Sequence, residues 1–283
     1  MKSIITIGTP AVHFGNFLKS YSEYTIYSFN HTGAEFSVPV FSAIERYEEP
    51  LKGLKKYVSS AADDITCVVS GGEVVTLTAL QILQKVKNKN IDIIYLQPPF
   101  DTLNKTGVMI HNLVHGVLQE LARSHVFKRF YLFDLELIKK MSAKVILGEV
   151  NKTTAEACAQ HYHTFNWLAS QKPVFGLNEQ GVTNATISSL SYCDFNLTSV
   201  ADLGILGFIR EQEVFYGIPE KQIEKDTELY DKVIKSFKDF KKEDVTTSFN
   251  VCSVPFENEV VYIKNSTTAV QNKILKEALD KEG

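Results

Sequence analysis

VVSGGEVVTLTALQILQKVK, residues 68–87, is the stretch that decides the fold expected for this chain. An apolar run ends in two glycines, Gly71 and Gly72, and apolar residues then recur at helical spacing up to residue 87. A strand that enters a glycine turn and then a helix is the layout of a phosphate-binding loop, because bare backbone amides there meet the positive end of the helix. Glu73 follows the glycines directly, so the sequence raises the question whether this loop still binds an anion.

Strand and helix signals alternate along the first half of the chain. Short apolar runs predict strands at 3–8, 24–29, 65–70, 91–97 and 129–134, and helices are expected near 15–22, 50–60, 74–87 and 107–125. Short strands separated by helices favour a Rossmann-like α/β lobe, with a mainly parallel sheet covered on both faces. Ligands of such sheets bind beyond the carboxyl ends of the strands, where the segments GTP, FNHTG, SGGE and QPPFD fall.

A long helix divides this half from a smaller second half. Apolar residues at helical spacing predict the helix over 152–170, with Thr153 or Thr154 capping its start. Beyond it the pattern predicts strands at 203–210, 213–218, 247–254 and 259–265, a solvated helix within 220–244, and a last helix from about 267 to 281. We therefore expect a sheet lobe over 1–150, a central core helix over 151–172 and a smaller α+β lobe over 173–283.

Composition excludes several classes of protein. The 283 residues carry a net charge of −3, which gives no general field for nucleic acid. No run of about 18 apolar residues is present to span a bilayer, and the N-terminus lacks a signal-peptide pattern. We therefore expect a cytoplasmic protein with no membrane or nucleic-acid partner. Its four cysteines are widely spaced, so buried thiols are expected in place of disulfides or a zinc site: Cys67, Cys158, Cys193 and Cys252.

Several motifs that carry chemistry are absent from the sequence. No lysine follows Gly72 at the Walker spacing GxxxxGK[ST], and neither GxGxxG nor the GxSxG nucleophile elbow occurs. His111 and His115 lie four residues apart and share a helix face, as in a metal half-site, but no third ligand accompanies them. We expect a polar helix surface there and no metal.

Five loops, which occur in the same order along the chain as in the family, give this sequence a resemblance to the tubulin and FtsZ superfamily. GGEVVTL at 71–77 lies over the family signature GGGTGTG without a gap, and IGTPAVHFGNF at 7–17 matches the first family loop at both edges. FNHTGA at 29–34 resembles the NTDA loop, PPFD and its helix resemble the PF loop, and FYLFDLELI at 130–138 resembles the PND turn. The likeness covers about residues 1–175. It implies a tubulin/FtsZ-like fold with a Rossmann-like parallel sheet lobe, a long central helix and a smaller α+β C-terminal lobe.

The resemblance implies that these loops would bind GTP or GDP, if the chain binds a cofactor at all. The positions that match the family's nucleotide-binding loops are Gly8, Gly15, Asn16, Asn30, Thr32, Gly71, Gly72, Thr76, Pro99, Phe100 and Asp134. Departures concentrate in the phosphate loop, where Glu73, Val75 and Leu77 replace small residues and Val74 replaces a threonine. A carboxylate that faces phosphates in a water-poor loop costs on the order of several kcal/mol, so ordinary GTP binding is not expected.

Two arrangements of Glu73 are compatible with the sequence. Its side chain either points to solvent and caps the first turn of its own helix, which is the favoured interpretation, or holds a cation that bridges to phosphate. Replacement of Glu73 by glycine is expected to raise anion affinity if the side chain faces the loop.

In the resembled family, a neighbouring subunit completes the hydrolytic site through an acidic loop after the core helix. PVFGLNEQGVTNATISSL at 173–190 stands there, and Asn178 and Glu179 match only the start of that loop, as weak catalytic candidates. The later aspartate position falls on 181–183, a glycine, a valine and a threonine, while Asp194 and Asp202 have the wrong spacing. Loss at both halves of the site predicts that GTP hydrolysis is weak or lost, because positioning and electrostatics supply nearly all such catalysis.

Three functional hypotheses follow from the sequence. The leading one is a structural or cytoskeletal component that associates head to tail with itself or with a tubulin/FtsZ-like partner protein. The second is an active, GTP-dependent filament-forming GTPase with remodelled loops, and the third is a metabolic enzyme that uses another ligand in a Rossmann-like crevice. The short chain, without an acidic tail or linker, favours a phage or prokaryotic source, and the host cytoplasm if it is viral.

Overall fold

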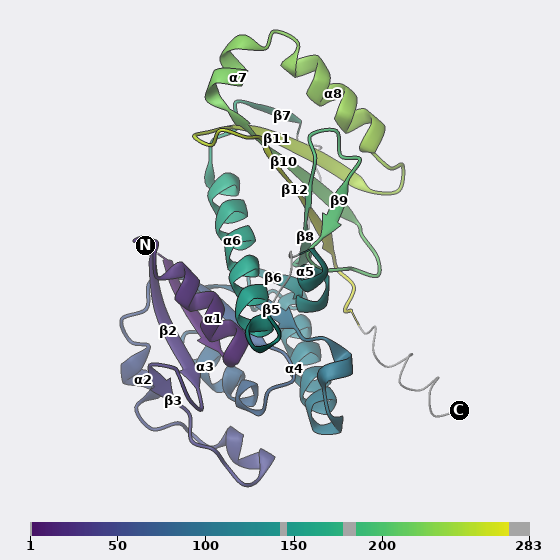
Figure 1. Ribbon diagram of the computed structural model, residues 1–283. Coiled ribbons are helices and arrows are strands. Elements are labelled where there is room, and N and C mark those ends of the chain that lie inside the picture. Colours follow the sequence, from purple (N-terminus) through teal and green to yellow (C-terminus); the bar gives the residue numbers. More distant parts are fainter. Residues whose placement is uncertain (1, 142–145, 178–184, 272–283) are drawn as a thin grey trace, which may run out of the picture.

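Two lobes joined by a long helix make up the molecule (Figure 1). The computed structural model describes residues 2–141, 146–177 and 185–271. The strands are β1 (Lys2–Ile7), β2 (Tyr24–Asn30), β3 (Phe36–Ser37), β4 (Asp64–Ser70), β5 (Asn90–Gln97), β6 (Arg129–Asp134), β7 (Phe175–Leu177), β8 (Ile187–Cys193), β9 (Val200–Asp202), β10 (Glu211–Pro219), β11 (Thr246–Val254) and β12 (Val260–Thr267). The α-helices are α1 (Thr9–Leu18), α2 (Leu54–Tyr57), α3 (Ala79–Lys85), α4 (Lys105–Arg123), α5 (Leu135–Met141), α6 (Val150–Ser170), α7 (Glu220–Lys225) and α8 (Leu229–Phe240). Short 3-10 turns are η1 (Ile44–Glu48), η2 (Val74–Thr78), η3 (Phe100–Thr102) and η4 (Leu147–Glu149).

In the described part of the chain the strands form one sheet, in the order β3-β2-β1-β4-β5-β6-β8-β12-β10-β11-β7, with β9 paired to β8. Strands β1 to β6 are parallel throughout. β8 joins β6 in parallel, and the rest of the C-terminal half mixes parallel and antiparallel pairs. The predicted parallel α/β sheet is confirmed for the N-terminal half, and the sheet continues without a break into the second lobe.

The parallel strands are buried on both faces. Ile4 of β1 and Val68 of β4 belong to the core that includes α1 and α6, whereas their neighbours Ile5 and Val69 belong to the core that includes α3 and α4. Side chains alternate between the faces of a strand, so a strand covered by helices on both sides reads as a continuous apolar run. This is why the sequence signals the parallel strands clearly.

The C-terminal lobe has its own core, between α8 and the strands β10, β11 and β12. Val233 and Phe237 of α8 pack with Tyr216 and Phe249, and Figure 1 shows α7 and α8 lying over this part of the sheet. The single helix predicted within 220–244 is divided into two helices, α7 and α8, by residues 226–228.

Two predicted helices begin earlier than expected. The helix predicted near 15–22 extends from Thr9 to Leu18. Its early start is explained by Pro10, which lacks an amide hydrogen and fits the first turn of a helix. The helix predicted over 152–170 starts at Val150. Neither threonine caps it, since the Thr154 hydroxyl donates to the Val150 carbonyl at 2.8 Å inside the first turns.

Other helix predictions were too long. The region near 50–60 contains only α2 besides irregular chain, and the helix predicted over 74–87 begins as the turn η2 and becomes α-helical from Ala79. β12 extends to Thr267, where the last helix was expected to start, and residues 268–271 are irregular. The remainder of that predicted helix lies outside the described residues.

The strand predicted over 203–210 is wrong, because this segment is irregular. The Leu203 carbonyl accepts a hydrogen bond from the Asp134 amide at 2.7 Å, and a Cβ added at Gly204 would lie 2.2 Å from the Leu132 carbonyl oxygen. The segment therefore crosses closely over the end of β6. On the side of β6 away from β5, the neighbouring strand is β8, which the sequence did not signal.

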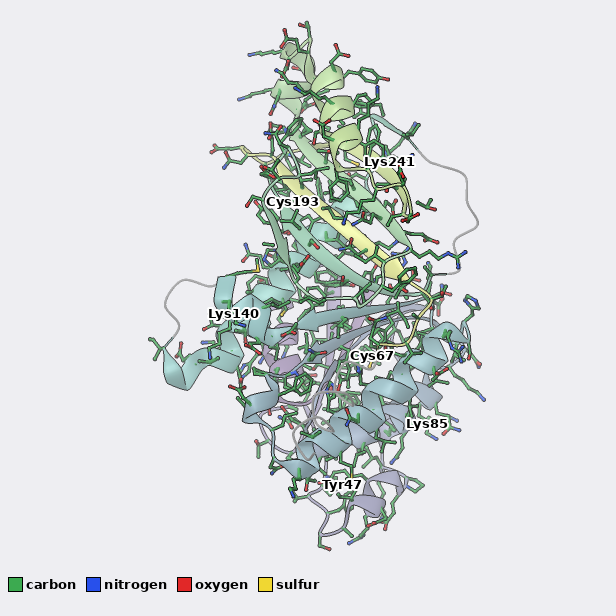
Figure 2. The ribbon with its side chains drawn as sticks, turned by 90° about the vertical axis from the view of Figure 1, so that its right-hand side faces the viewer. Tyr47, Cys67, Lys85, Lys140, Cys193 and Lys241 are labelled. Carbon is green, nitrogen blue, oxygen red and sulfur yellow. The ribbon has the colours of Figure 1, made fainter. Side chains whose placement is uncertain are left out.

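All four cysteines are free and buried, as expected. Figure 2 shows Cys67 inside the N-terminal lobe and Cys193 in the other lobe. Burial raises the pKa of the Cys67 and Cys158 thiols far above its ordinary value, so both stay protonated and unreactive. None of the described helices is both long enough and apolar enough to span a bilayer.

Candidate functional site

Five chain segments meet where the parallel strands end. Strands β1, β2, β4, β5 and β6 are adjacent and parallel, so the segments that follow them lie along one edge of the sheet (Figure 1). Because ligands of such sheets bind beyond the strand ends, we call these segments together the strand-end crevice. The segments that follow these strands begin with Gly8, His31, Gly71, Pro98 and, at the start of α5, Leu135. The loops after β1 and β4 form the part of this crevice that could receive an anion.

The double glycine forms a tight turn in which both residues are needed. The Gly71 amide donates to the Leu96 carbonyl at 2.8 Å, and a Cβ at Gly71 would lie 2.5 Å from Pro98 Cδ and 2.7 Å from the Tyr95 hydroxyl. Gly72 has a φ of +75°, a conformation that side chains with a Cβ rarely adopt. The turn therefore brings Ser70 and Glu73, on either side of it, toward the start of α1.

Side chains of this turn bind the first turn of α1. Glu73 Oε2 accepts hydrogen bonds from the Thr9 amide at 2.9 Å and from the Thr9 hydroxyl at 3.2 Å. Ser70 Oγ accepts from the Ala11 amide at 2.9 Å. Pro10, between them, has no amide hydrogen to offer. Every amide of residues 9–11 that can donate is therefore engaged by the chain itself.

This geometry shows that the favoured interpretation of Glu73 was wrong. Glu73 precedes η2, but its side chain makes no capping hydrogen bond there, and the Thr76 hydroxyl donates to the Glu73 carbonyl at 2.6 Å. The carboxylate instead lies at the N-terminus of α1, where amide donors and the helix dipole stabilise a negative charge. Glu73 caps a different helix from the one that follows it.

The environment of Glu73 shifts its protonation. Burial is the largest influence and raises the pKa of the carboxyl above its ordinary value, while the Thr9 hydrogen bonds and the electrostatic interaction with His31 act in the opposite direction. The His31 ring is itself fixed, with Nδ1 3.0 Å from the Val38 carbonyl and Nε2 3.1 Å from the Tyr47 hydroxyl. The carboxylate thus lies in a confined site with an imidazole nearby.

Of the residues predicted after β2, one joins this cluster. Asn30 is buried, and its Nδ2 donates to the Thr9 hydroxyl at 3.2 Å while its Oδ1 accepts from the His31 amide at 2.9 Å. Thr32 is exposed in the following loop. Gly8 also belongs to the cluster, since a Cβ there would lie 3.0 Å from Glu73 Oε2.

Three other predicted residues do not face the crevice. Gly15 packs α1 against the sheet, because a Cβ there would lie 2.7 Å from Thr6 Cγ2, and Asn16 is exposed further along the same helix. Thr76 is buried, and its hydroxyl is used within its own turn.

The predicted residues after β5 and β6 support local structure. Pro99 precedes the short turn η3, and the Phe100 ring of that turn meets the His111 ring edge-on at 5.0 Å between centroids. Asp134 Oδ1 accepts from the Glu136 amide at 2.9 Å at the start of α5, and its Oδ2 accepts from Gln97 Nε2 at 3.0 Å. Asp134 therefore acts as a helix cap in this structure.

The expectation of a polar helix surface at His111 and His115 is wrong. The two residues are 0% and 6% exposed, and the His111 Nδ1 lies 2.9 Å from the hydroxyl of Tyr95, on whose ring His115 stacks. Burial lowers the pKa of His111 to about 4, and burial with the nearby His111 lowers that of His115 to about 3. Both imidazoles are neutral at pH 7. Within the described ranges no three His, Cys, Asp or Glu side chains converge as a metal site.

The acidic and amide candidates for catalysis fall into two groups. Asn178 and Glu179, with residues 181–183, lie outside the described residues. Asp194 Oδ1 accepts from the Thr198 amide at 2.8 Å, and Asp202 Oδ1 accepts from the Ser191 hydroxyl at 2.7 Å, so both aspartates stabilise local turns and strand pairs.

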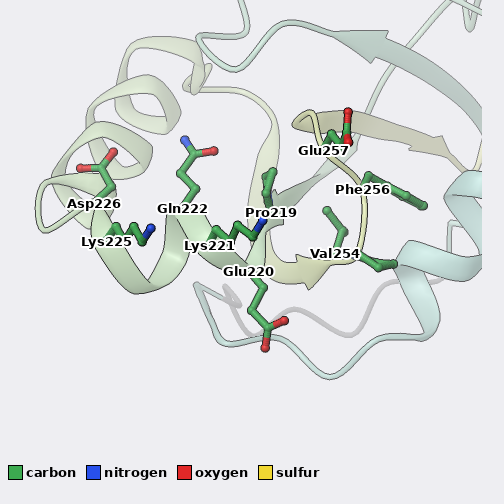
Figure 3. Close-up of a pocket in the computed structure, with 10 residues that line it drawn as sticks. Pro219, Glu220, Lys221, Gln222, Lys225, Asp226, Val254, Phe256 and Glu257 are labelled. Atoms are coloured by element: carbon green, nitrogen blue, oxygen red, sulfur yellow. The ribbon is translucent and has the colours of Figure 1, made fainter.

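A cavity of about 830 Å³ lies in the other lobe, between α7 and the turn after β11 (Figure 3). Lys221 and Lys225 come from α7, and Phe256 comes from the turn on the opposite side. Glu220, Asp226 and Glu257 also line it, so charges of both signs are mixed and no selectivity for an anion results. No residue of the strand-end crevice lines it.

The sequence missed two residues of the cluster. Thr9 and Ser70 were not among the predicted site residues, yet they hold Glu73 and Ala11 in place. Their positions in the sequence could have indicated both residues. Ser70 is the last residue of a buried strand before the glycine turn, and Thr9 immediately precedes Pro10 at a helix start.

Comparison with known proteins gives matches by structure and none by sequence. No protein-family model matches the chain, and no curated protein matches it. A GTPγS-form protofilament of TubZ from Bacillus thuringiensis serovar israelensis has a TM-score of 0.71 at 10% identity, over 100% of this chain and 92% of that chain. A GTPγS-bound protofilament of CetZ2 from Haloferax volcanii has a TM-score of 0.64 at 13% identity, over 100% and 99% of the two chains. An empty FtsZ dimer from M. jannaschii has a TM-score of 0.60 at 12% identity, over 94% and 87%.

The chain therefore has the tubulin/FtsZ superfamily fold, which confirms the resemblance at the level of architecture. Identities of 10% to 13% establish the fold alone. What the crevice does has to be argued from the residues that line it.

Proposed function

We propose that this chain is a self-associating structural component of the tubulin/FtsZ kind, in which GTP hydrolysis is weak or lost. The TubZ and CetZ2 structures that it resembles are protofilaments, which supports association of this fold into linear assemblies. The crevice chemistry supports loss of nucleotide turnover.

The occupied first turn of α1 is the observation that carries this proposal. A helix N-terminus binds phosphate through free amides and the positive end of its dipole. Here the Thr9 and Ala11 amides already donate to Glu73 and Ser70, so a phosphate has to displace both side chains. It also meets the Glu73 charge, and two like charges about 4 Å apart repel by about 4 kcal/mol at an effective dielectric constant near 20. Ordinary GTP binding thus requires the glycine turn to rearrange.

A second copy of the chain is the proposed partner. In a head-to-tail contact, the strand-end crevice of one copy faces the C-terminal lobe of the next. Such a contact joins two different surfaces, so it propagates into an open filament unless its rotation closes a ring. A separate tubulin/FtsZ-like protein is the alternative second subunit.

The proposal is tested with the purified full chain, by light scattering and sedimentation over a range of protein concentrations, with and without GTP and Mg²⁺. Phosphate release is measured in the same samples. We expect assembly that depends on protein concentration and not on GTP, with no phosphate release above background.

Two results would overturn it. GTP-dependent scattering with steady phosphate release would establish the active GTPase in its place. A chain that stays monomeric at high concentration, and that forms no complex with a tubulin/FtsZ-like protein from the same source, would remove the structural role.

A further inference from the structure

A second polar cavity, of about 190 Å³, lies between the two lobes. Arg129 contributes to it from the first residue of β6, so the cavity is at the opposite end of that strand from the strand-end crevice. The C-terminal end of α6 and the strands β10, β11 and β12 supply the other walls. We call this the interlobe cavity. Its polar lining side chains are Arg129, Gln171, Glu213, Asn250 and Lys264.

Among the described residues, positive charge is in excess around the interlobe cavity. Lys264 Nζ pairs with Glu213 Oε2 at 3.3 Å, and Asn250 Nδ2 donates to Glu213 Oε1 at 3.0 Å, so both oxygens of this carboxylate are used. Asp92, which also interacts electrostatically with Arg129, is paired with Lys2 at 3.3 Å. The three cations Arg129, Lys264 and Lys2 therefore share only the two carboxylates of Glu213 and Asp92.

Most donors of the Arg129 guanidinium have no partner among the described residues. A guanidinium carries five N–H groups in a planar fork that fits an oxyanion through two parallel hydrogen bonds. In the part of the chain that the structure describes, Arg129 makes one side-chain hydrogen bond, from Nη1 to the Tyr131 hydroxyl at 3.4 Å. Because Arg129 is only partly exposed, its charge is less screened by solvent and salt than that of a surface arginine.

The size of the cavity limits what it can hold. Pockets for drug-sized ligands are about 300–1,000 Å³, so the interlobe cavity, with 190 Å³, suits an ion of the size of phosphate or acetate and excludes a nucleoside triphosphate. Apolar groups, among them those of Phe165, Leu168 and Phe215, form the remaining walls and keep the site compact.

We propose that the interlobe cavity binds a small oxyanion, held by the Arg129 fork and the Lys264 ammonium. Arg129 belongs to the N-terminal lobe and Lys264 to the C-terminal lobe, so the ion bridges the two lobes and fixes their relative position. A ligand that binds only the folded chain also stabilises it by mass action. This site shares no residue with the Glu73 cluster and is independent of the proposed function.

Thermal unfolding of the full chain tests the proposal, in inorganic phosphate, acetate and chloride at equal pH and ionic strength. Near saturation, phosphate or acetate is expected to raise Tm by about 2–4 °C over chloride. The more effective of the two tells whether the site favours a phosphoryl or a carboxylate group. The R129Q variant is expected to lose this increase, and the control K238Q, which removes an exposed lysine of α8, is expected to keep it.

Equal Tm values in the three salts would overturn the proposal. An R129Q variant with the full increase would also overturn it, because the ion would then bind elsewhere. If R129Q does not fold, R129K replaces it, since lysine keeps the charge but lacks the planar fork. The same Tm increase then requires about tenfold more oxyanion in R129K, and an unchanged concentration dependence contradicts the proposal.

Discussion

Glu73 acts within the chain as a ligand for the first turn of α1. Its carboxylate takes hydrogen bonds from the Thr9 amide and hydroxyl, and Asn30 supports that hydroxyl from β2. A tethered carboxylate has a high effective concentration at this site, so a free anion competes at a disadvantage even before charge repulsion is counted. A change of this one residue should therefore alter the binding properties of the crevice.

Glu73→Gly is expected to raise the affinity of the chain for inorganic phosphate at least tenfold. The change removes a like charge and frees the Thr9 amide, and about 1.4 kcal/mol is enough for a tenfold effect. Isothermal titration calorimetry measures the affinity. Glu257→Gly, which removes an exposed acid in the turn after β11, is the matched control and should leave it unchanged. An unchanged or lower affinity in Glu73→Gly would show that Glu73 does not face the anion.

The raised pKa of Glu73 predicts a pH dependence of stability. A carboxyl with a higher pKa in the folded than in the unfolded chain binds more protons when the chain is folded. Its contribution to the free energy of unfolding is therefore full at low pH, and it is lost as the pH rises from the ordinary pKa of 4.5 through the raised pKa. Other carboxylates titrate in the same range, so wild type is compared with Glu73→Gln by urea unfolding at several pH values. The free energy of unfolding of wild type should fall relative to the variant as pH rises. A constant difference, or a relative gain by wild type, is the contrary result.

The glycine turn after β4 depends on close contact among β4, β5 and α4. A Cβ at Gly71 would lie 2.5 Å from Pro98 Cδ and 3.0 Å from His111 Nδ1. The proline ring is closed on the backbone and His111 is buried, so neither can move aside easily. Gly71→Ala is therefore expected to destabilise the chain by about 1–3 kcal/mol, as overpacking does. Urea unfolding measures this. Gly116→Ala, on α4, adds a Cβ that meets no described atom within 4 Å outside the backbone of its own helix, so it should be neutral or stabilising by up to about 1 kcal/mol. Equal effects of the two substitutions would contradict the close packing of the turn.

The sequence predicted those elements whose environment is uniform along their length. β1, β4 and β5 are apolar because both faces are covered, so local composition is enough to find them. β8 was missed because its serines are buried and satisfied by other strands: Ser188 Oγ lies 2.9 Å from Ser266 Oγ, and Ser191 Oγ donates to Asp202. Such pairs depend on the tertiary arrangement, which a local pattern does not contain.

The position of the candidate site was predictable, but its internal contacts were not. Parallel strands place their following loops together, so the segments around Gly8, Asn30 and Gly71 were expected at one edge. The direction of Glu73 depends on where α1 starts, and that start at Thr9 was not predicted. The burial of His111 and His115 depends on Tyr95 from β5, which the helix pattern of α4 does not reveal.

Helix α6 packs against both lobes and connects them. Cys158 and Phe165 of α6 belong to one core with Phe14 from the N-terminal lobe and with Phe215 and Cys252 from the C-terminal lobe. The sheet also passes from β6 to β8 without interruption. A core shared in this way leaves neither lobe with an independent hydrophobic interior on that face, so separation of the lobes would expose apolar surface of both.

One cooperative unfolding transition is therefore expected for the two lobes. Trp167, the single tryptophan, lies on α6 with its ring centroid 5.3 Å from that of Phe256, and its fluorescence reports on the C-terminal side. Cys67 is buried in the N-terminal lobe and Cys252 in the C-terminal lobe, so pulsed thiol labelling in urea, with the labelled peptides identified by mass spectrometry, reports on each lobe separately. The midpoints from Trp167, Cys67 and Cys252 should coincide, because two-state unfolding exposes all three together. If Cys67 became labelled at a urea concentration where the Trp167 fluorescence was still native, the lobes would unfold independently, and α6 would not couple them.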